Sequence, residues 1–313
     1  MEISLFENCT LCPRKCGATR TNEANRNLSN STGDDIRNGY CGQTNQIKLA
    51  RAALHYYEEP CISGSNGSGA VFFSGCNLGC VFCQNQSISH ENYGKVISVE
   101  RLAAIFIELQ NKSAHNINLV TPTHFVPSII KAIKAARTGG LSIPIVYNTS
   151  SYEMPETINL LNGHVNVYLP DFKYWDNELA QKYSKAPNYR EFAIKSIDKM
   201  VEQRPVQKFD EKGIMQEGVI VRHMILPGHT KDSMKIIEYL YKTYGNSISL
   251  SLLSQYTPLK HVEKYPELNR KITKREYNKV VDYALSLGVS NAFIQEGNAV
   301  GESFIPQFNL EGI

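Results

Sequence analysis

Three closely spaced cysteines are the residues of this sequence best suited to redox chemistry. Cys76, Cys80 and Cys83 lie within eight residues, and Gly75 and Gly79 leave the backbone room to approach a bulky group. Three thiolates can ligate three irons of a [4Fe–4S] cluster, which leaves the fourth iron without a protein ligand. An iron with an open coordination site can bind and reduce a small molecule. A zinc knuckle fits less well, because zinc normally takes four ligands.

A second group of cysteines lies near the N-terminus. Cys9, Cys12, Cys16 and Cys41 make a complete set of four thiolates, which could hold an auxiliary [4Fe–4S] cluster, a rubredoxin-like iron or a structural zinc. Cys61 stands alone, and we interpret it as a small buried side chain. The sequence therefore predicts two metal centres, and the metal of the second one stays open.

The composition is that of an ordinary globular protein. Of the 313 residues, 42% are hydrophobic and 20% are charged, and a chain of this length can form one α/β barrel domain. The 33 basic and 30 acidic residues give a net charge of +3, so we expect no nucleic-acid and no membrane partner. The sequence lacks a bilayer-length apolar stretch and the pattern of a signal peptide, so we expect a cytoplasmic protein. In the cytoplasm, cysteines are more often metal ligands than disulfides.

Strand and helix signals alternate after residue 50. The first strand runs directly into the loop with the three cysteines, and Ser98 is a predicted N-cap. Six or seven β–α units in a row imply a parallel sheet with right-handed crossovers, whose strand-end loops face the active site. We predict strands at residues 70–73, 116–120, 143–147, 165–169, 219–226, 247–253 and 292–294, and helices at residues 99–110, 126–137, 154–161, 177–201, 233–244 and 274–287.

The first 50 residues show little apolar periodicity, and residues 18–38 are rich in Asn, Ser, Thr and charge. We therefore predict two units: a cysteine-rich N-terminal segment, residues 1–50, that its metal orders, and a barrel domain, residues 51–313. The predicted fold class is α/β, a partial (β/α)6-type parallel barrel with a small metal-tethered appendage.

The spacing of the first cysteine group resembles the signature of the radical S-adenosylmethionine superfamily. Three residues separate Cys76 from Cys80, two separate Cys80 from Cys83, and the aromatic Phe82 precedes the last cysteine. The resemblance implies that the open iron chelates the amino and carboxylate groups of S-adenosylmethionine. An electron from the cluster then cleaves the sulfonium, and the resulting 5′-deoxyadenosyl radical abstracts hydrogen from a substrate.

Further segments resemble one group of this superfamily, the pyruvate formate-lyase-activating enzymes, and particularly relatives with an extra N-terminal cysteine segment. That similarity implies a glycyl-radical enzyme as the partner and a flavodoxin or ferredoxin as the reductant. A neighbouring group, that of the AmmeMemoRadiSam system, has a similar cysteine arrangement and stays open as an alternative. The similar segments are residues 9–17, 39–42, 58–64, 76–83, 116–125, 147–153, 170–174, 222–228 and 254–258.

The resemblance also assigns individual residues to cofactor binding. Asp171 and Lys173 match the Asp-x-Lys pair that lies beside the methionyl carboxylate in activating enzymes, and a lysine can neutralise that carboxylate. Asn148 and Thr149 match an Asp-Thr pair thought to help hold a monovalent cation, so the asparagine removes one negative charge from that site. Arg222 matches an arginine that faces the cofactor or peptide, and an inward arginine needs an anionic partner.

One segment departs from the activating enzymes. Their Gly-Gly-Glu sequence, which holds the amino group of the cofactor, is absent after the second strand, and residues 120–124 (Val-Thr-Pro-Thr-His) stand there instead. Thr121 and Thr123 could accept hydrogen bonds from the ammonium group. His124 is either a partner of the cofactor or a structural residue.

Two other functions stay open. The protein could use the same radical chemistry to modify a small molecule or an unrelated protein. It could also be a two-cluster electron-transfer or scaffold protein, in which Cys61 would have to complete the ligands of the core cluster. A laterally open barrel could admit the loop of a protein partner, whereas a fully closed barrel could not.

Overall fold

A computed structural model describes residues 4–21, 39–295 and 306–313 of the chain. Within these residues, seven parallel strands form the centre of the fold, and they lie side by side in the order of the sequence. The predicted α/β fold with a mostly parallel, barrel-like sheet is confirmed. The strands are β2 (Ser68–Phe73), β4 (Ile117–Val120), β5 (Ile145–Thr149), β6 (Val167–Pro170), β8 (Met215–Met224), β9 (Ser249–Leu253) and β10 (Ala292–Ile294).

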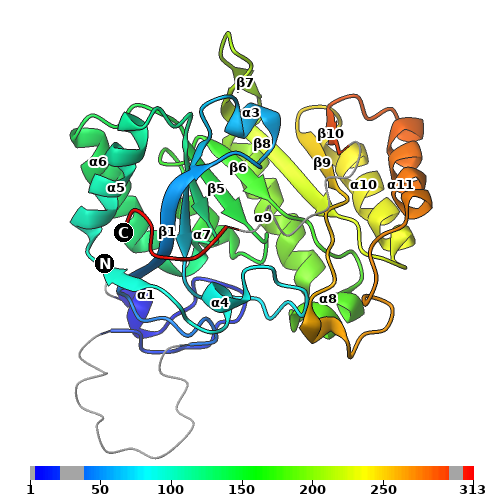
Figure 1. Ribbon diagram of the computed structural model, residues 1–313, viewed down its shortest axis with the longest axis horizontal. Helices are drawn as coiled ribbons and strands as arrows, with labels where there is room; N and C mark the ends of the chain where they lie inside the picture. Colours follow the sequence, from blue (N-terminus) through cyan, green and yellow to red (C-terminus); the bar gives the residue numbers. More distant parts are fainter. Residues whose placement is uncertain (1–3, 22–38, 296–305) are drawn as a thin grey trace, which may run out of the picture.

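Amphipathic helices connect the strands and pack outside the sheet. In α5, Ser98 caps the first turn by accepting a hydrogen bond from the backbone nitrogen of Arg101, and Leu102, Phe106 and Leu109 are buried on one face. Figure 1 shows α5 and α6 on one side of the sheet and α10 and α11 on the other. The helices are α5 (Val99–Asn111), α6 (Val126–Thr138), α7 (Pro155–Leu160), α8 (Asn177–Ser184), α9 (Tyr189–Gln203), α10 (Thr230–Tyr244) and α11 (Lys274–Leu287), with short 3₁₀ turns η1 (Thr123–Phe125) and η2 (Lys260–Val262).

The helical region predicted at residues 177–201 consists of two helices, α8 and α9. Lys185 and Asn188 adopt left-handed backbone conformations, with φ of 51° and 54°. Pro187 lies between them and has no N–H to continue the hydrogen-bond pattern of α8. The break turns the end of α8, with Ser184, toward the loop of the three cysteines.

Antiparallel strands that the sequence alone did not predict extend one end of the sheet. β1 (Ile47–His55) pairs with β2, and β3 (Lys95–Ile97) pairs with β1. A two-residue strand, β7 (Lys208–Phe209), pairs with the start of β8. β1 crosses residue 50, the boundary predicted between the appendage and the barrel domain.

A short helix, α3 (Pro60–Ser63), closes the interior of the barrel at the amino ends of the strands. Ile62 is fully buried, and Cys61 and Ile62 pack with inward residues of the strands, among them Val146 and Val167. The Asn116 side chain donates a hydrogen bond to the carbonyl oxygen of Ile62 at 2.7 Å. In Figure 1, α3 lies at the upper edge of the sheet, whereas α4 (Gln86–Ser89) and the N-terminal segment lie at the lower edge. The expectation that Cys61 is a small buried side chain is confirmed.

The N-terminal segment, which begins with α1 (Ser4–Glu7), has a small apolar cluster of its own around Phe6 and Leu11. Arg20 is buried and donates to the carbonyl oxygen of His124 at 2.8 Å. The Thr157 hydroxyl donates to the carbonyl oxygen of Leu11 at 2.7 Å. The segment is therefore anchored to the carboxyl-end side of the barrel by hydrogen bonds and has a small core of its own, whereas the sequence analysis expected a bound metal to supply its order.

The last eight residues, 306–313, return to the edge of β1. The backbone nitrogen of Ala52 donates to the carbonyl oxygen of Glu311 at 2.8 Å, and that of Leu310 donates to Ala50 at 3.2 Å. The ring of Phe308 packs edge-on against Phe72, with 5.4 Å between centroids. This C-terminal tail covers the part of the β1 edge that follows β3.

Candidate active site

The three predicted cluster ligands line one cavity at the carboxyl ends of the strands. Cys76, Cys80 and Cys83 lie on the loop that leaves β2 and face a space of about 270 Å³. Gly75 starts this loop with φ of +86°, and a Cβ there would lie 2.6 Å from the carbonyl oxygen of Cys41. Glycine is therefore required where the N-terminal segment packs against the loop.

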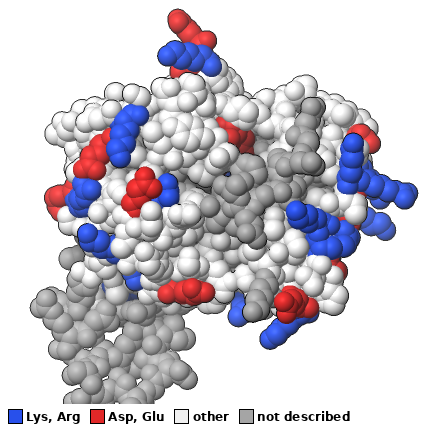
Figure 2. Space-filling view, viewed as in Figure 1, with Lys and Arg blue, Asp and Glu red and all other residues white. Residues whose placement is uncertain are grey.

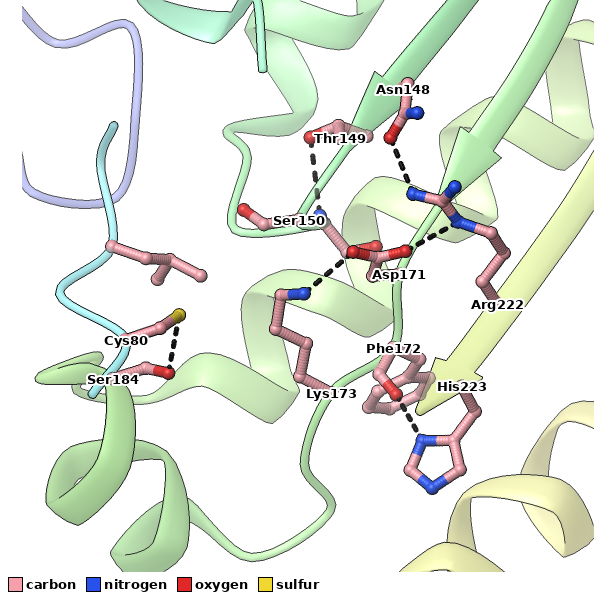
Figure 3. A network of polar contacts seen from close by, with 12 residues as sticks. Cys80, Asn148, Thr149, Ser150, Asp171, Phe172, Lys173, Ser184, Arg222 and His223 are labelled. Atoms are coloured by element: carbon pink, nitrogen blue, oxygen red, sulfur yellow. Dashed lines mark hydrogen bonds and ion pairs between the residues drawn. The ribbon is translucent and has the colours of Figure 1, made fainter. Parts of the chain in front are cut away.

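Polar groups contact the sulfur atoms of the loop. The Ser184 hydroxyl donates to Cys80 Sγ at 2.9 Å (Figure 3), and the Ser89 hydroxyl lies 3.2 Å from Cys83 Sγ. Burial raises the pKa of all three thiols, to about 11 for Cys80, where the Lys173 ammonium opposes the rise. The thiols are thus neutral without a metal, and ligation would release their protons.

This donor set fits an iron–sulfur cluster. Three thiols around one cavity, with serine hydroxyls in hydrogen-bond contact with two of the sulfurs, match what such a cluster binds. Across residues 4–21, 39–295 and 306–313, no three His, Cys, Asp or Glu side chains are gathered tightly enough to hold a single metal ion. A cluster does not require that gathering, because each thiolate binds a different iron.

Charged residues form a network beside the cysteines (Figure 3). The Lys173 ammonium donates to Asp171 Oδ2 at 2.7 Å, and Arg222 Nε donates to Asp171 Oδ1 at 2.7 Å. Arg222 Nη2 donates to the Asn148 side-chain oxygen at 2.6 Å. Burial alone would raise the pKa of Asp171, but the cations of Arg222 and Lys173 outweigh it and lower that pKa. The structure therefore brings these four predicted residues together.

Glu58 completes the network, and the sequence analysis did not assign it a role. It follows β1, and its Oε2 accepts a hydrogen bond from Arg222 Nη1 at 2.8 Å. Its Oε1 accepts from the side chains of Asn118 at 3.0 Å and Asn148 at 3.3 Å. Although burial opposes the charge of Arg222, the carboxylates of Asp171 and Glu58 raise its pKa. The only sequence signal for Glu58 was its place in the similar segment 58–64.

The two cations of the network have different roles. Nε, Nη1 and Nη2 of Arg222 all donate to protein oxygens, so Arg222 positions Asp171 and Asn148. The Lys173 ammonium has three hydrogens, and one of them serves Asp171. In Figure 3, Lys173 reaches into the space between Asp171 and Cys80. Lys173 is therefore placed to receive an anionic group in the cavity.

The remaining predicted residues divide between the cavity and the core. Thr121 lines the cavity, as does Phe82, whose ring packs edge-on against Tyr256. Thr123 does not line it: its hydroxyl is buried and donates to Glu153 at 2.6 Å. His124 is buried too, and its Nε2 lies 2.7 Å from the carbonyl oxygen of Ser74. Burial lowers the pKa of His124 to about 3, so it is neutral and has a structural contact.

The N-terminal segment, which carries the second cysteine group, lies at the lower edge of the barrel in Figure 1. The thiols of Cys9 and Cys16 are in hydrogen-bond contact, and Cys12, Cys16 and Cys41 lie within electrostatic range of one another. Arg20 Nη1 donates to Cys9 Sγ at 3.4 Å. The four predicted ligands therefore lie near one another, although among the described residues no three of them are close enough to hold a single metal ion.

The outer surface carries charge of both signs. Figure 2 shows Lys and Arg side chains gathered over the region of α11, and acidic and basic side chains mixed on the opposite side of the view. None of the helices formed by the described residues is both apolar enough and long enough to span a membrane.

Comparisons with known proteins agree with this geometry. Residues 70–240, more than half of the chain, match the family model of the radical SAM superfamily. An uncharacterized protein of Methanocaldococcus jannaschii is 30% identical over 291 residues, which are 90% of this chain and 75% of that protein. The chain belongs to the radical SAM superfamily. Membership implies an enzyme with a [4Fe–4S] cluster and S-adenosylmethionine.

Solved structures of the same superfamily resemble the chain more distantly. Streptococcus suis SuiB bound to S-adenosylmethionine has a TM-score of 0.48 and 13% identity, over 71% of this chain and 48% of SuiB, so the chain spans about half of that protein. A domain of a pyruvate-formate lyase-activating enzyme from Bacteroides vulgatus has a TM-score of 0.40 and 17% identity, over 55% of this chain and 91% of that domain.

Proposed function

We propose that this protein cleaves S-adenosylmethionine reductively at a cluster held by Cys76, Cys80 and Cys83, and uses the product to abstract hydrogen from a partner. The observation that carries this proposal is the shared cavity: the three thiols and the Lys173–Asp171 ion pair line the same space. When bound, the cluster supplies an open iron and the electron that breaks the sulfonium bond.

The protein's own residues bind and orient the cofactor. Lys173 neutralises the methionyl carboxylate, because its ammonium faces the cavity and retains free hydrogens. Asn148 and Thr121 line the wall beside it and supply polar atoms for the ammonium group. Arg222 holds Asp171 and Asn148 in place by hydrogen bonds, and Glu58 accepts hydrogen bonds from both Arg222 and Asn148. Phe82 and Tyr256, whose rings pack together, form an apolar part of the wall of the same cavity.

The proposed partner is a glycyl-radical enzyme, with a flavodoxin or ferredoxin as reductant, in the cytoplasm. Among the described strands, β3 and β10 end the sheet and do not pair with each other, so these strands do not close into a full barrel. An open side can admit a peptide loop. A small molecule or another protein, as in an AmmeMemoRadiSam-like reaction, is the alternative substrate.

Electron transfer without cofactor cleavage is a poorer fit. A carrier would need a fourth protein ligand for the core cluster, and Cys61 was the candidate. Cys61 lies in α3 at the amino ends of the strands, whereas the cluster loop follows their carboxyl ends. A second metal centre at Cys9, Cys12, Cys16 and Cys41 is also part of the proposal.

The test is an anaerobic assay for 5′-deoxyadenosine after reconstitution with iron and sulfide and reduction by dithionite. The wild type is expected to form it, and the Cys76/Cys80/Cys83→Ala variant is expected to form none. Cys61→Ala is the matched control, since it removes a cysteine outside both groups and should keep activity. A wild-type protein with a full core cluster and no product in the presence of S-adenosylmethionine contradicts the proposal.

A further inference from the structure

The N-terminal cysteine group lies directly against the loop that carries the core-cluster ligands. The carbonyl oxygen of Cys41 packs so closely on Gly75 that a Cβ there would lie 2.6 Å from it. Arg14 Nε donates to the carbonyl oxygen of Asn77 at 2.8 Å. Gly75 and Asn77 flank Cys76. Cys41, a predicted ligand of the N-terminal group, therefore contacts the residue next to Cys76, a predicted ligand of the core cluster.

A second contact reinforces the first. Tyr40 precedes Cys41, and its hydroxyl would lie 2.7 Å from a Cβ at Gly79, the residue before Cys80. The Arg14 guanidinium stacks on the Tyr40 ring at 3.6 Å from its centroid. Arg14 and Tyr40 thus hold the N-terminal segment against the loop, at Asn77 and at Gly79.

The order of the four N-terminal cysteines favours iron–sulfur over zinc. Cys9, Cys12 and Cys16 lie within eight residues, and Cys41 is a distant fourth ligand. Three clustered cysteines with one distant partner are typical of ferredoxin motifs. Structural zinc sites more often combine two separate pairs.

We propose that these four cysteines hold a second [4Fe–4S] cluster, through which electrons reach the core cluster by way of Cys41 and Gly75. The inference rests on the proposed function, because only cofactor cleavage consumes electrons at the core. Each cleavage uses one electron from a flavodoxin- or ferredoxin-class donor, which is oxidised by one electron. That electron would break the bond between the sulfonium sulfur and the 5′ carbon, which would give methionine and the 5′-deoxyadenosyl radical. Both clusters return to their starting state.

The position of the segment suits this role. Cys12 and Cys16 are partly exposed, and Lys15 and Gly17 beside them are exposed, so an external donor can approach. The core ligands face the cavity instead, where S-adenosylmethionine binds in the proposed function. Electron delivery and cofactor binding therefore take place on different sides of the same loop.

Metal content is the first test. After anaerobic reconstitution, the wild type and Cys61→Ala should contain about eight irons per chain, and Cys12→Ser/Cys16→Ser about four. About four irons with one zinc in the wild type overturns the proposal. The metal content of the wild type alone distinguishes a second cluster from zinc, so this test remains valid even if the double variant fails to fold.

Electron paramagnetic resonance and reduction kinetics are the second test. The fully reduced wild type should show signals broadened by two interacting clusters, and the double variant a single unbroadened signal. Arg14→Met and Tyr40→Leu keep every cysteine, so iron should stay at about eight per chain while reduction of the core cluster by a flavodoxin-class donor slows about tenfold or more. Two non-interacting signals, or an unchanged rate in all variants, overturn the proposal.

The two proposals fail in different ways. Dithionite is a small reductant that can reach the core cluster directly, so the double variant should still form 5′-deoxyadenosine with it. Absence of product from the wild type would contradict the proposed function. Product from the wild type, together with zinc in the N-terminal site, would contradict only the electron route.

Discussion

Glu58 and Arg222 are a buried ion pair whose partners are far apart in the chain. Their side chains are 11% and 13% exposed, and 164 residues separate them. Glu58→Ala should lower the free energy of unfolding by about 3 kcal/mol, because Arg222 loses a carboxylate and two asparagines lose their acceptor. Anaerobic urea denaturation measures this. Glu58→Gln keeps an acceptor oxygen and should lose less; equal losses in the two variants would contradict this explanation.

Glu153 gives the protein a pH-dependent stability. Burial raises its pKa to about 7, although the hydroxyls of Thr123, Thr149 and Tyr147 lower it. The unfolded value is near 4.5, so between pH 4.5 and 7 the folded chain holds a proton that the unfolded chain has lost. Stability therefore falls as pH rises through this window and levels off above it.

Glu153→Gln should remove this contribution. The free energy of unfolding of the wild type should decrease more steeply from pH 4.5 to 7 than that of the variant, by about 3 kcal/mol in total. Unfolding curves at several pH values measure the difference in free energy of unfolding between the two proteins. The other titrating groups are the same in both proteins, so their contributions cancel in this difference. Parallel pH profiles for the two proteins would show that Glu153 is ionised at neutral pH.

At the scale of elements, the helix α3 closes the interior of the barrel at the amino ends of the strands. Ile62 is fully buried among inward strand residues, so Ile62→Ala leaves a cavity. We expect a loss of about 2–4 kcal/mol in the free energy of unfolding, with iron content unchanged. Leu285→Ala, on the exposed face of α11, is the control and should have little effect. Loss of the core cluster in Ile62→Ala would mean that α3 also shapes the cysteine loop.

The parallel elements were predictable because each one has a local pattern. Strands β4 to β6 are short apolar runs, and helices such as α5 carry apolar residues on one face. β1 was missed because Ile47–His55 contains three Ala and one Lys, residue types with low strand propensity. It is a strand because β2 and β3 pair with it, and such pairing has no local signal.

In the site, too, residues with a local sequence pattern were predictable and residues that depend on distant contacts were not. Cys76, Cys80 and Cys83 were predictable because their chemistry depends on spacing in the sequence, and Asp171 and Lys173 because they match the Asp-x-Lys motif of the activating enzymes. The position of Thr123 was not predictable, because it depends on a carboxylate thirty residues away. The pairing of Arg222 with Glu58 was not predictable either, because the two residues are 164 positions apart in the sequence.

At the scale of the whole molecule, the C-terminal tail covers the edge of β1. Deleting residues 306–313 removes the acceptor of the Ala52 amide and uncovers Phe72, which lines the cavity. Amide hydrogen exchange at Ala52 should become faster, because the amide becomes exposed to water. The Ile117 amide, bonded to Pro144 inside the sheet, should not change. Unchanged exchange at Ala52 would mean that the tail does not protect this edge.

The central claim concerns the open iron of the core cluster, and electron paramagnetic resonance of the reduced protein tests it most directly. Adding S-adenosylmethionine should change the g values of the core-cluster signal in the wild type, because the cofactor becomes a ligand of the iron without a cysteine. In Lys173→Met, the same change should require a higher cofactor concentration. A spectrum that stays identical at saturating S-adenosylmethionine would contradict the account.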